Sequence, residues 1–396
     1  MKRLKSEVTE CLVQNILPYW LRLQDEEHGG FYGEVTGSEV PVPTADRGAI
    51  LYARILWAFS AAYRVLHKTE YLRAATRAKD YILAHFIDHE YGGTYWSVDY
   101  LGNPKDTKKQ FYAIGFMIYG FSEYVRATGD PTALQTAISL YHCIEEYSLD
   151  TVHNGYIEAT TRDWQPIADM RLSEKDENQA KSQNSHLHII EPYANLYRVW
   201  QDEGLKKAIS NLLHLFDDVM RDKQTNHINL FFDMEWHCTK ALSQGPKESY
   251  GHDIEASWLI DEAATLIGEP HNDFVFSVAK AASEGLNADG SMRHEDTDPD
   301  IHWWVMAETV VGYANIYQRL TEQPDATHHI DEILLNRRRT YEAWEYIKTH
   351  LVDHQHGEWY WSCSPDGKPN TTDDKAGFWK CPYHNSRMCL EIIQRF

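Results

Sequence analysis

The 396-residue sequence lacks cysteine pairs at metal-binding spacing, an excess of basic residues and a long uninterrupted apolar run at its start. Its six cysteines contain no CxxC motif, which argues against a zinc ribbon or a dense disulfide framework, and we expect buried thiols. The formal net charge of -21 argues against nucleic-acid binding, which requires clustered Lys and Arg. We expect neither a signal peptide nor a membrane span. A cytoplasmic globular protein with a neutral or cationic partner is therefore predicted.

Aromatic residues, by contrast, are abundant. The 13 Trp and 24 Tyr exceed the usual need of a core of this size, and hydrophobic residues at 43% already suffice to build that core. Flat aromatic faces stack on sugar rings, so the surplus is compatible with a carbohydrate ligand.

A segment rich in glycine and aromatic residues recurs six times, roughly every 60 to 70 residues. Each copy alternates polar and aromatic residues around a turn, which is typical of a short β-hairpin. The copies cover residues 25–39, 88–104, 150–166, 224–238, 286–298 and 353–369.

Two helical stretches lie between successive copies. The first of each pair is apolar on nearly all sides, as expected of a helix packed on both faces, and the second carries a charged face. This pattern predicts an all-α (α/α)6 barrel: six helical hairpins in a single domain over residues 1–396, with the β-hairpins as loops at one end. An N-terminal helix over 4–22 would close the ring against the last inner helix. The inner helices are expected over 48–66, 112–125, 187–200, 256–267, 304–317 and 384–393.

An open helical array is the alternative to a closed barrel, since it is also built of helix pairs. Residues 168–183 and 321–340 do not follow the repeat pattern, and either could form a lid or an edge contact.

Ionisable and aromatic side chains fall near the starts of all six inner helices. In a barrel whose inner helices run parallel, these ends converge on one mouth, so distant parts of the chain would supply one pocket. The helical spacings of three and four residues place Asn184 with His188, and His252 with Glu255, on common helix faces. The candidates are Arg54, Tyr112, Asn184, His188, His252, Glu255, Trp304, Glu308, Trp379 and His384.

The histidines suggest proton transfer. We expect His384 to follow Pro382 in the first helical turn, where the positive helix end would keep the imidazole neutral and therefore basic. A neutral histidine can take and return a proton near pH 7. Glu255 and Glu308 could orient the rings, and Arg54 would either pair with one of these carboxylates or bind an anionic oxygen of a reaction intermediate.

A metal site is the alternative use of this region. His252, Asp253 and Glu255 could supply its ligands, whereas His186 should point away from His188 on a helix and so is poor evidence for a shared ion.

Three long segments carry a family resemblance. Residues 181–200, 249–264 and 374–392 closely resemble segments of the cellobiose 2-epimerases, which belong to the N-acylglucosamine 2-epimerase superfamily, and the likeness spans nearly the whole chain. The resemblance implies an (α/α)6 barrel that inverts C2 of the reducing-end glucose of cellobiose and related β-1,4-linked disaccharides. It implies no metal or nucleotide cofactor.

The same resemblance implies a role for each candidate. His252 and His384 would be the acid/base pair at C2, and His188, near Asn184, would assist ring opening and hold the intermediate. The remaining positions match pocket residues Arg54 and Tyr112, carboxylates Glu255 and Glu308, and sugar platforms Trp304 and Trp379.

Other activities stay open at this stage. A mannose 2-epimerase or an aldose-ketose isomerase would share the enediolate intermediate but act on free monosaccharides. A glycosidase could use Glu255 and Glu308 as its carboxylate pair, and a sugar-binding barrel without catalysis would also fit. The expected partner is a small sugar, and we expect a monomer or weak homodimer.

Overall fold

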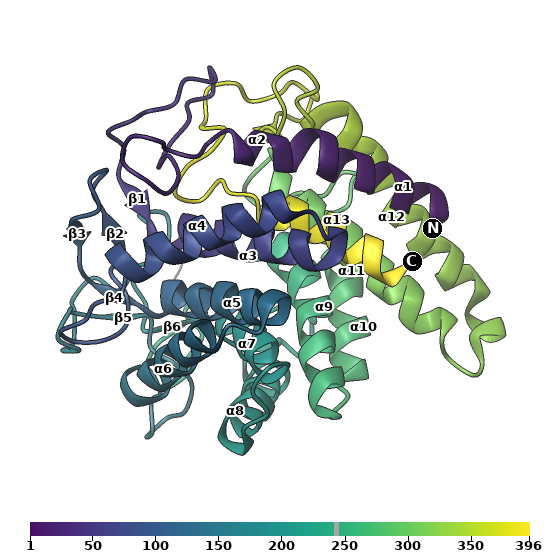
Figure 1. Ribbon diagram of the computed structural model, residues 1–396. Helices are drawn as coiled ribbons and strands as arrows, with labels where there is room; N and C mark the ends of the chain where they lie inside the picture. Colours follow the sequence, from purple (N-terminus) through teal and green to yellow (C-terminus); the bar gives the residue numbers. More distant parts are fainter. Residues whose placement is uncertain (241–244) are drawn as a thin grey trace.

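The computed structural model describes residues 1–240 and 245–396, and its inner helices form a closed ring. Each inner helix packs against the next one along the chain, and α13 packs back against α3. The (α/α)6 barrel predicted from the sequence is therefore confirmed, and the open array is wrong (Figure 1). The inner helices are α3 (Ala49–Leu66), α5 (Phe111–Thr128), α7 (Gln183–Tyr197), α9 (Tyr250–Ile267), α11 (Trp303–Thr321) and α13 (His384–Arg395).

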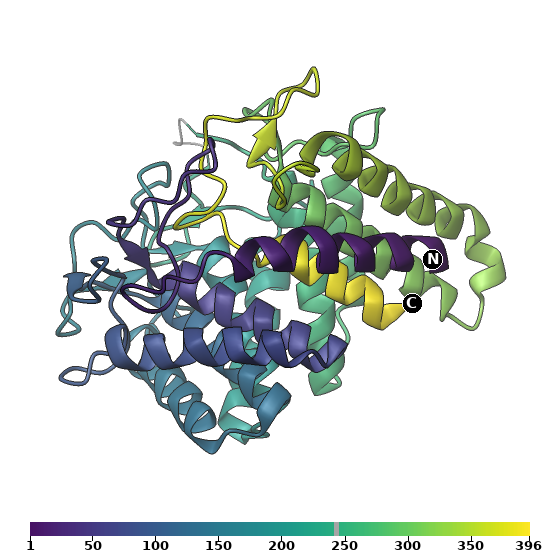
Figure 2. The ribbon, with the colours of Figure 1, turned by 45° about the horizontal axis from the view of Figure 1, so that its top comes forward.

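Outer helices cover the ring. The N-terminal run lies along α13, so the first and last helices of the chain are neighbours (Figure 2). This run comprises α1 (Lys2–Cys11), the π-helical turn η1 (Leu12–Ile16) and α2 (Leu17–Leu21). The others are α4 (Thr69–His85), α6 (Pro131–Tyr147), α8 (Glu203–His214) with η2 (Leu215–Met220), α10 (Asn272–Ala282) with η3 (Ser283–Gly285), and α12 (Ile330–Tyr346) with η5 (Ile347–Leu351).

Residues 321–340, which do not follow the repeat pattern in the sequence, are mostly helical. After a short 3-10 turn, η4 (Ala326–His329), most of this stretch belongs to α12, which packs on α11 as the fifth outer helix. Its polarity reflects an outer helix with one wide solvent face.

Burial explains the apolar character of the inner helices. Every residue of α3 from Ala49 to Ala62 is buried, because the helix touches α5 and α13 on its sides and α4 outside. By length and composition α3 could cross a membrane, but 78% of its apolar window is enclosed by protein. Its hydrophobicity is thus that of a barrel core.

Six hairpins join the repeats, as the recurring sequence element predicts. They gather at one end of the barrel, away from the two chain termini (Figure 1). Antiparallel bridges close them at Gln24↔Phe31, Ile87↔Thr94, Leu149↔Tyr156, Arg221↔Ile228, Leu286↔Met292 and Val352↔Trp359.

Short strands also connect neighbouring repeats. The segment entering each inner helix pairs with the hairpin of the next repeat, and the last one pairs with the first hairpin through Val35↔Ala376, so the pairing runs around the whole ring. The strands are β1 (Arg47–Gly48), β2 (Ser97–Val98), β3 (Pro104–Asp106), β4 (Lys109–Gln110), β5 (Ala159–Thr160), β6 (Lys181–Ser182), β7 (Phe231–Phe232), β8 (Ile301–His302) and β9 (Ser362–Cys363).

Each of five hairpins turns in the same way. An aspartate accepts hydrogen bonds from the backbone N–H groups two and three residues later, as Asp150 does from Val152 and His153. A residue in the left-handed region then completes the turn, which favours Gly or Asn at that position. The aspartates are Asp25, Asp88, Asp150, Asp222 and Asp353, and the left-handed residues are Gly29, Gly92, Asn154, Asn226 and Gly357.

Buried cations fasten four of these turns to the segments that lead into inner helices. Lys181, just before α7, lies 2.8 Å from the carboxylate of Asp150 and also donates to the carbonyls of Asn154 and Met234. These clamps fix the positions of the helix starts around the mouth. The other pairs are Arg47–Asp25, Lys109–Asp88 and Lys375–Asp353.

The cysteines follow the expectation only in part. Cys363, Cys381 and Cys389 are buried, but Cys11 and Cys143 are half-buried and Cys238 is exposed. All six are free thiols.

Candidate active site

The three candidate histidines lie around one set of aromatic rings. The imidazoles of His252 and His384 both contact the indole of Trp304, with ring centroids 5.0 and 5.5 Å from it. His188 lies against Tyr112, at 5.0 Å between ring centroids. The structure therefore brings residues of five inner helices to one place, as their positions near the helix starts predict.

His384 is fixed by Glu308. Its Nδ1 lies 2.7 Å from Oε1 of that carboxylate, so Nδ1 carries the donated proton and Nε2 keeps a free lone pair. Burial, reinforced by the nearby Arg54 and Arg387, lowers the pKa of His384 well below its usual range. The ring is thus a neutral base.

The physical cause of this neutrality differs from the one predicted. Helix α13 begins at His384, so Pro382 precedes the helix and does not occupy its first turn. His384 is indeed at the helix start, but burial is the leading reason for its lowered pKa.

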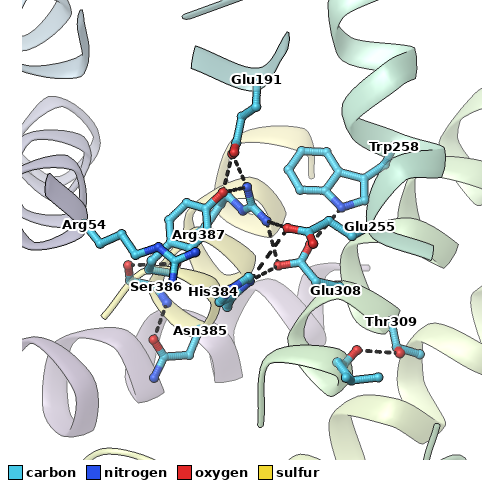
Figure 3. A network of polar contacts seen from close by, with 12 residues as sticks. Arg54, Glu191, Glu255, Trp258, Glu308, Thr309, His384, Asn385, Ser386 and Arg387 are labelled. Atoms are coloured by element: carbon cyan, nitrogen blue, oxygen red, sulfur yellow. Dashed lines mark hydrogen bonds and ion pairs between the residues drawn. The ribbon is translucent and has the colours of Figure 1, made fainter. Parts of the chain in front are cut away.

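Arg387 contacts three buried carboxylates, and it was not among the site residues predicted from the sequence. Its guanidinium lies 2.7 Å from both Glu255 and Glu308 and also bonds Glu191 (Figure 3). One signal was available, because Arg387 lies three residues after His384 on the same helix. Its partners are 79 to 196 positions away, beyond what local spacing can indicate.

The three carboxyl groups around Arg387 have different pKa shifts. Burial and the repulsion of Glu308 raise the pKa of Glu255 well above its usual range, and burial raises that of Glu308 despite Arg387. Burial would also raise the pKa of Glu191, but Arg387 and the hydrogen bond from His188 outweigh it, and the pKa falls to about 2. These directions keep Glu191 ionised and favour a protonated Glu255, whose pKa is raised further than that of Glu308.

Glu191 also orients His188. The His188 Nδ1 lies 2.9 Å from its Oε2, which leaves Nε2 facing Glu255 at 3.9 Å. Burial lowers the pKa of His188, so this imidazole too is neutral near pH 7.

A kink in α7 sets the position of His188. The backbone of His188 is not helical, with φ -91 and ψ 17, and Pro192 four residues later has no N–H to offer its carbonyl. The carbonyl instead faces α5 at Gly115, where a Cβ would lie only 2.4 Å from it. A glycine is therefore required at that position.

Ser249, at the start of α9, holds the imidazole of His252 by a hydrogen bond. Its Nδ1 lies 2.7 Å from Ser249 Oγ, and burial lowers the pKa of His252 to about 3. The neighbouring Asp253 faces the other way, where its carboxylate contacts Nδ1 of His227 at 2.6 Å. The alternative metal site of His252, Asp253 and Glu255 is therefore not assembled.

Two further histidines lie next to His252 and were not among the candidates. His294 has its ring centroid 5.8 Å from that of His252 and 5.0 Å from that of Trp304, and His302 is the next ring, 5.3 Å from His294. They come from the fifth repeat, the weakest copy in the sequence, so no clear motif marked them.

Arg54 has no carboxylate partner among the described residues, so the predicted ion pair with Glu255 or Glu308 is wrong. Its guanidinium donates to the Tyr112 hydroxyl at 2.9 Å and lies over the rings of Phe116 and Tyr383. A buried cation whose partners are mainly aromatic rings is poised for an anionic group of a ligand.

Trp379 lies beside Tyr112, whereas Asn184 lines a separate small cavity. The ring of Trp379 is half-buried, 6.1 Å from that of Tyr112. Asn184 lines a small cavity with Asp176 and Glu177, which belong to the irregular segment 168–183, and its buried Oδ1 has no hydrogen-bond partner among the described residues. That segment therefore borders the start of α7.

Glu255 and Glu308 are not arranged as a glycosidase pair. Both carboxylates contact the same nitrogen of Arg387, so they lie side by side. A glycosidase needs its two carboxyl groups on opposite sides of the scissile bond.

Comparison with known proteins identifies the family. The N-acylglucosamine 2-epimerase (GlcNAc 2-epimerase) family profile matches residues 30–387. This chain belongs to that family of enzymes. A cellobiose 2-epimerase of Bacteroides fragilis is 53% identical over 402 residues and 98% of each chain, and one of Dictyoglomus turgidum is 37% identical over 100% of this chain and 99% of its own.

Solved structures agree with the family assignment. The cellobiose 2-epimerase of Bacillus thermoamylovorans superimposes with a TM-score of 0.91 at 39% identity, covering 100% of both chains. A D-mannose isomerase superimposes with a TM-score of 0.83 at 17% identity over 99% of this chain and 98% of its own, which shows a shared fold alone.

Proposed function

We propose that this family member is a cellobiose 2-epimerase, which inverts C2 of the reducing-end glucose to give the mannose-ended disaccharide. The observation that carries the proposal is the contact of two neutral imidazoles, His252 and His384, with one indole. Two bases beside one aromatic platform can act on the two faces of a single sugar carbon. The resemblance to relatives that bear this name over their full length supports the choice of substrate.

The reaction runs through proton transfer at C2. Ring opening exposes an aldehyde, which acidifies the hydrogen on C2. One histidine removes that proton to give a cis-enediolate. The other takes up a proton from solvent and delivers it to the opposite face of C2, so the configuration inverts, and the first histidine then releases its proton to solvent. Because the pKa values of both rings are lowered, each is available as a free base near neutral pH.

Charge on the enediolate oxygens needs a partner in the site. Arg54 supplies a buried positive charge with no carboxylate partner among the described residues, and a protonated Glu255 supplies a neutral hydrogen-bond donor. Such preorganised groups stabilise a developing oxyanion without reorganisation during the reaction. His188 donates its Nδ1 proton to Glu191, so its Nε2 would accept a hydrogen bond from a sugar hydroxyl during ring opening. Arg387 is already bound to three carboxylates and acts by positioning them.

The partly exposed rings of Trp304 and Trp379 are the platforms for the sugar. A disaccharide is the proposed substrate, bound without a metal or nucleotide cofactor. Six free thiols suit a reducing compartment, so we also propose that the enzyme is cytoplasmic. We propose separately that it is a monomer or weak homodimer.

A product assay tests this function. The purified chain is incubated separately with cellobiose, mannose and fructose, and products are identified by NMR. The proposal expects a glucosyl-mannose product from cellobiose and slower reaction of the monosaccharides. A fructose-ended product would indicate an isomerase, free glucose would indicate a glycosidase, and binding without turnover would indicate a sugar-binding protein; each would contradict the proposal.

A further inference from the structure

Two histidines and a glutamate form a compact cluster far from the sugar site. His214 ends α8, whereas Glu269 and His271 lie in the connection between α9 and α10. One ligand atom from each of the three lies within 4.8 Å of the other two. The cluster is at the C-terminal end of α9, an 18-residue helix about 27 Å long that carries His252 at its other end.

We propose that this cluster binds a divalent transition metal ion, with Zn²⁺ as the best match. The donor set would be Nε2 of His214, Oε1 of Glu269 and Nε2 of His271. Two imidazoles and one carboxylate suit zinc, and the nitrogen donors disfavour Mg²⁺ and Ca²⁺, which prefer oxygen ligands.

The distances fit one small ion. Nε2 of His214 lies 3.0 Å from Oε1 of Glu269, and Nε2 of His271 lies 3.8 Å from the same oxygen. In a tetrahedral zinc site with bonds of about 2.0 to 2.2 Å, ligand atoms are separated by about 3.4 Å. Small side-chain rotations therefore suffice to coordinate the ion.

The imidazole of His271 is oriented as a metal-ligating histidine usually is. A ligating histidine commonly donates its other ring N–H to a carboxylate, which fixes the tautomer and leaves the second nitrogen for the metal. Nδ1 of His271 lies 3.3 Å from Asp217, and Nδ1 of His214 lies 3.7 Å from Asp218. Asp217 thus holds His271 by a hydrogen bond, and Asp218 lies near enough to hold His214 after a small movement.

The exposure of the three side chains leaves room for a further ligand. His271 is 10% exposed and so is firmly placed, whereas Glu269 is 35% and His214 is 59% exposed. Water would complete the coordination. A bound ion would tie the end of α8 to the connection that follows α9, and so stabilise two neighbouring repeats.

Calorimetric titration of the chelator-treated full chain with zinc chloride tests the site. We expect one binding event that is lost in His271→Ala and His214→Ala and is weakened roughly 10-fold or more in Asp217→Asn. The exposed His237→Ala is the matched control, because His237 contacts a carboxylate but has no second histidine beside it. Zinc should raise the melting temperature of wild type and His237→Ala, raise that of Asp217→Asn less, and leave His271→Ala and His214→Ala unchanged, and magnesium should raise none of them.

Two results would overturn the proposal. The first is an unchanged zinc isotherm in the His214→Ala/His271→Ala double variant, which would place the ion elsewhere, for example on the exposed thiol of Cys238. The second is equal stabilisation by magnesium. Epimerase activity is a separate readout: all variants should keep it, so failure of the proposed sugar reaction would leave this test intact.

Discussion

At the scale of single residues, the proposed mechanism depends on the hydrogen bond from His384 to Glu308, which sets the tautomer of the imidazole. Glu308→Gln would present an amide that can donate to Nδ1 and move the imidazole proton to Nε2, the nitrogen needed for catalysis. We expect kcat to fall roughly 100- to 10,000-fold with a smaller change in KM. Steady-state kinetics on cellobiose measure this, with exposed Glu10→Gln as the control. A kcat within a few-fold of wild type would show that Glu308 does not set the tautomer.

The buried histidines also predict how stability depends on pH. The pKa of His252 is about 3 in the folded chain and near 6.5 when unfolded, so between these values the unfolded chain binds a proton that the folded chain excludes. The stabilisation is complete above about pH 6.5 and is lost as the pH falls, by up to about 1.4 kcal/mol per unit.

Urea unfolding of wild type and His252→Asn at pH 7, 6 and 5 measures this effect. The free energy of unfolding should fall less steeply with decreasing pH in His252→Asn than in wild type. The exposed His89→Asn is the matched control and should follow the wild-type curve. Parallel curves for wild type and His252→Asn would contradict the lowered pKa.

At the scale of secondary-structure elements, the clamps between hairpins and helix starts hold the mouth. Lys181→Met would leave the buried Asp150 carboxylate and the carbonyls of Asn154 and Met234 without their cation. We expect a loss of about 3–5 kcal/mol in the free energy of unfolding, because one partner of a buried ion pair is removed. Denaturant unfolding measures it, with the exposed Lys207→Met as control. Equal stability of the two variants would refute the clamp.

The elements themselves were largely predictable, because their signals are local. Asp, Gly and Asn mark the hairpin turns through hydrogen bonds and backbone freedom, and the apolar spacing marks the inner helices. The same local signals did not identify α12, because its wide polar face obscures the apolar spacing of a helix. They also missed Arg387 and Glu191, because the contact that makes them part of the site joins residues 196 positions apart.

At the scale of the whole molecule, the barrel closes where the two ends of the chain meet. Glu358, in the sixth hairpin, accepts hydrogen bonds from Trp20 of the N-terminal run, from the buried Lys380 and from Asn385 beside His384. It does so from the left-handed region, with φ 62, at the turn position where three other hairpins carry Gly30, Gly93 and Gly155, so its buried contacts offset the strain of a side chain there. This carboxylate therefore joins ring closure to the catalytic helix.

Glu358→Gln tests that link. The change would leave the fully buried Lys380 without a counter-charge, and we expect a loss of about 3–5 kcal/mol in stability together with reduced kcat. Unfolding curves and kinetics of the same preparation measure both, again beside Glu10→Gln. A variant as stable and active as this control would mean that the contacts of Glu358, where the two ends of the chain meet, do not support the site.

The account as a whole depends on two imidazoles acting at one carbon. The most direct measurement is NMR of cellobiose in heavy water with wild type, His252→Ala, His384→Ala and the exposed His89→Ala. We predict deuterium at C2 of the product with wild type and His89→Ala, and neither inversion nor exchange with either active-site variant. Exchange and inversion retained in both His252→Ala and His384→Ala would contradict the mechanism.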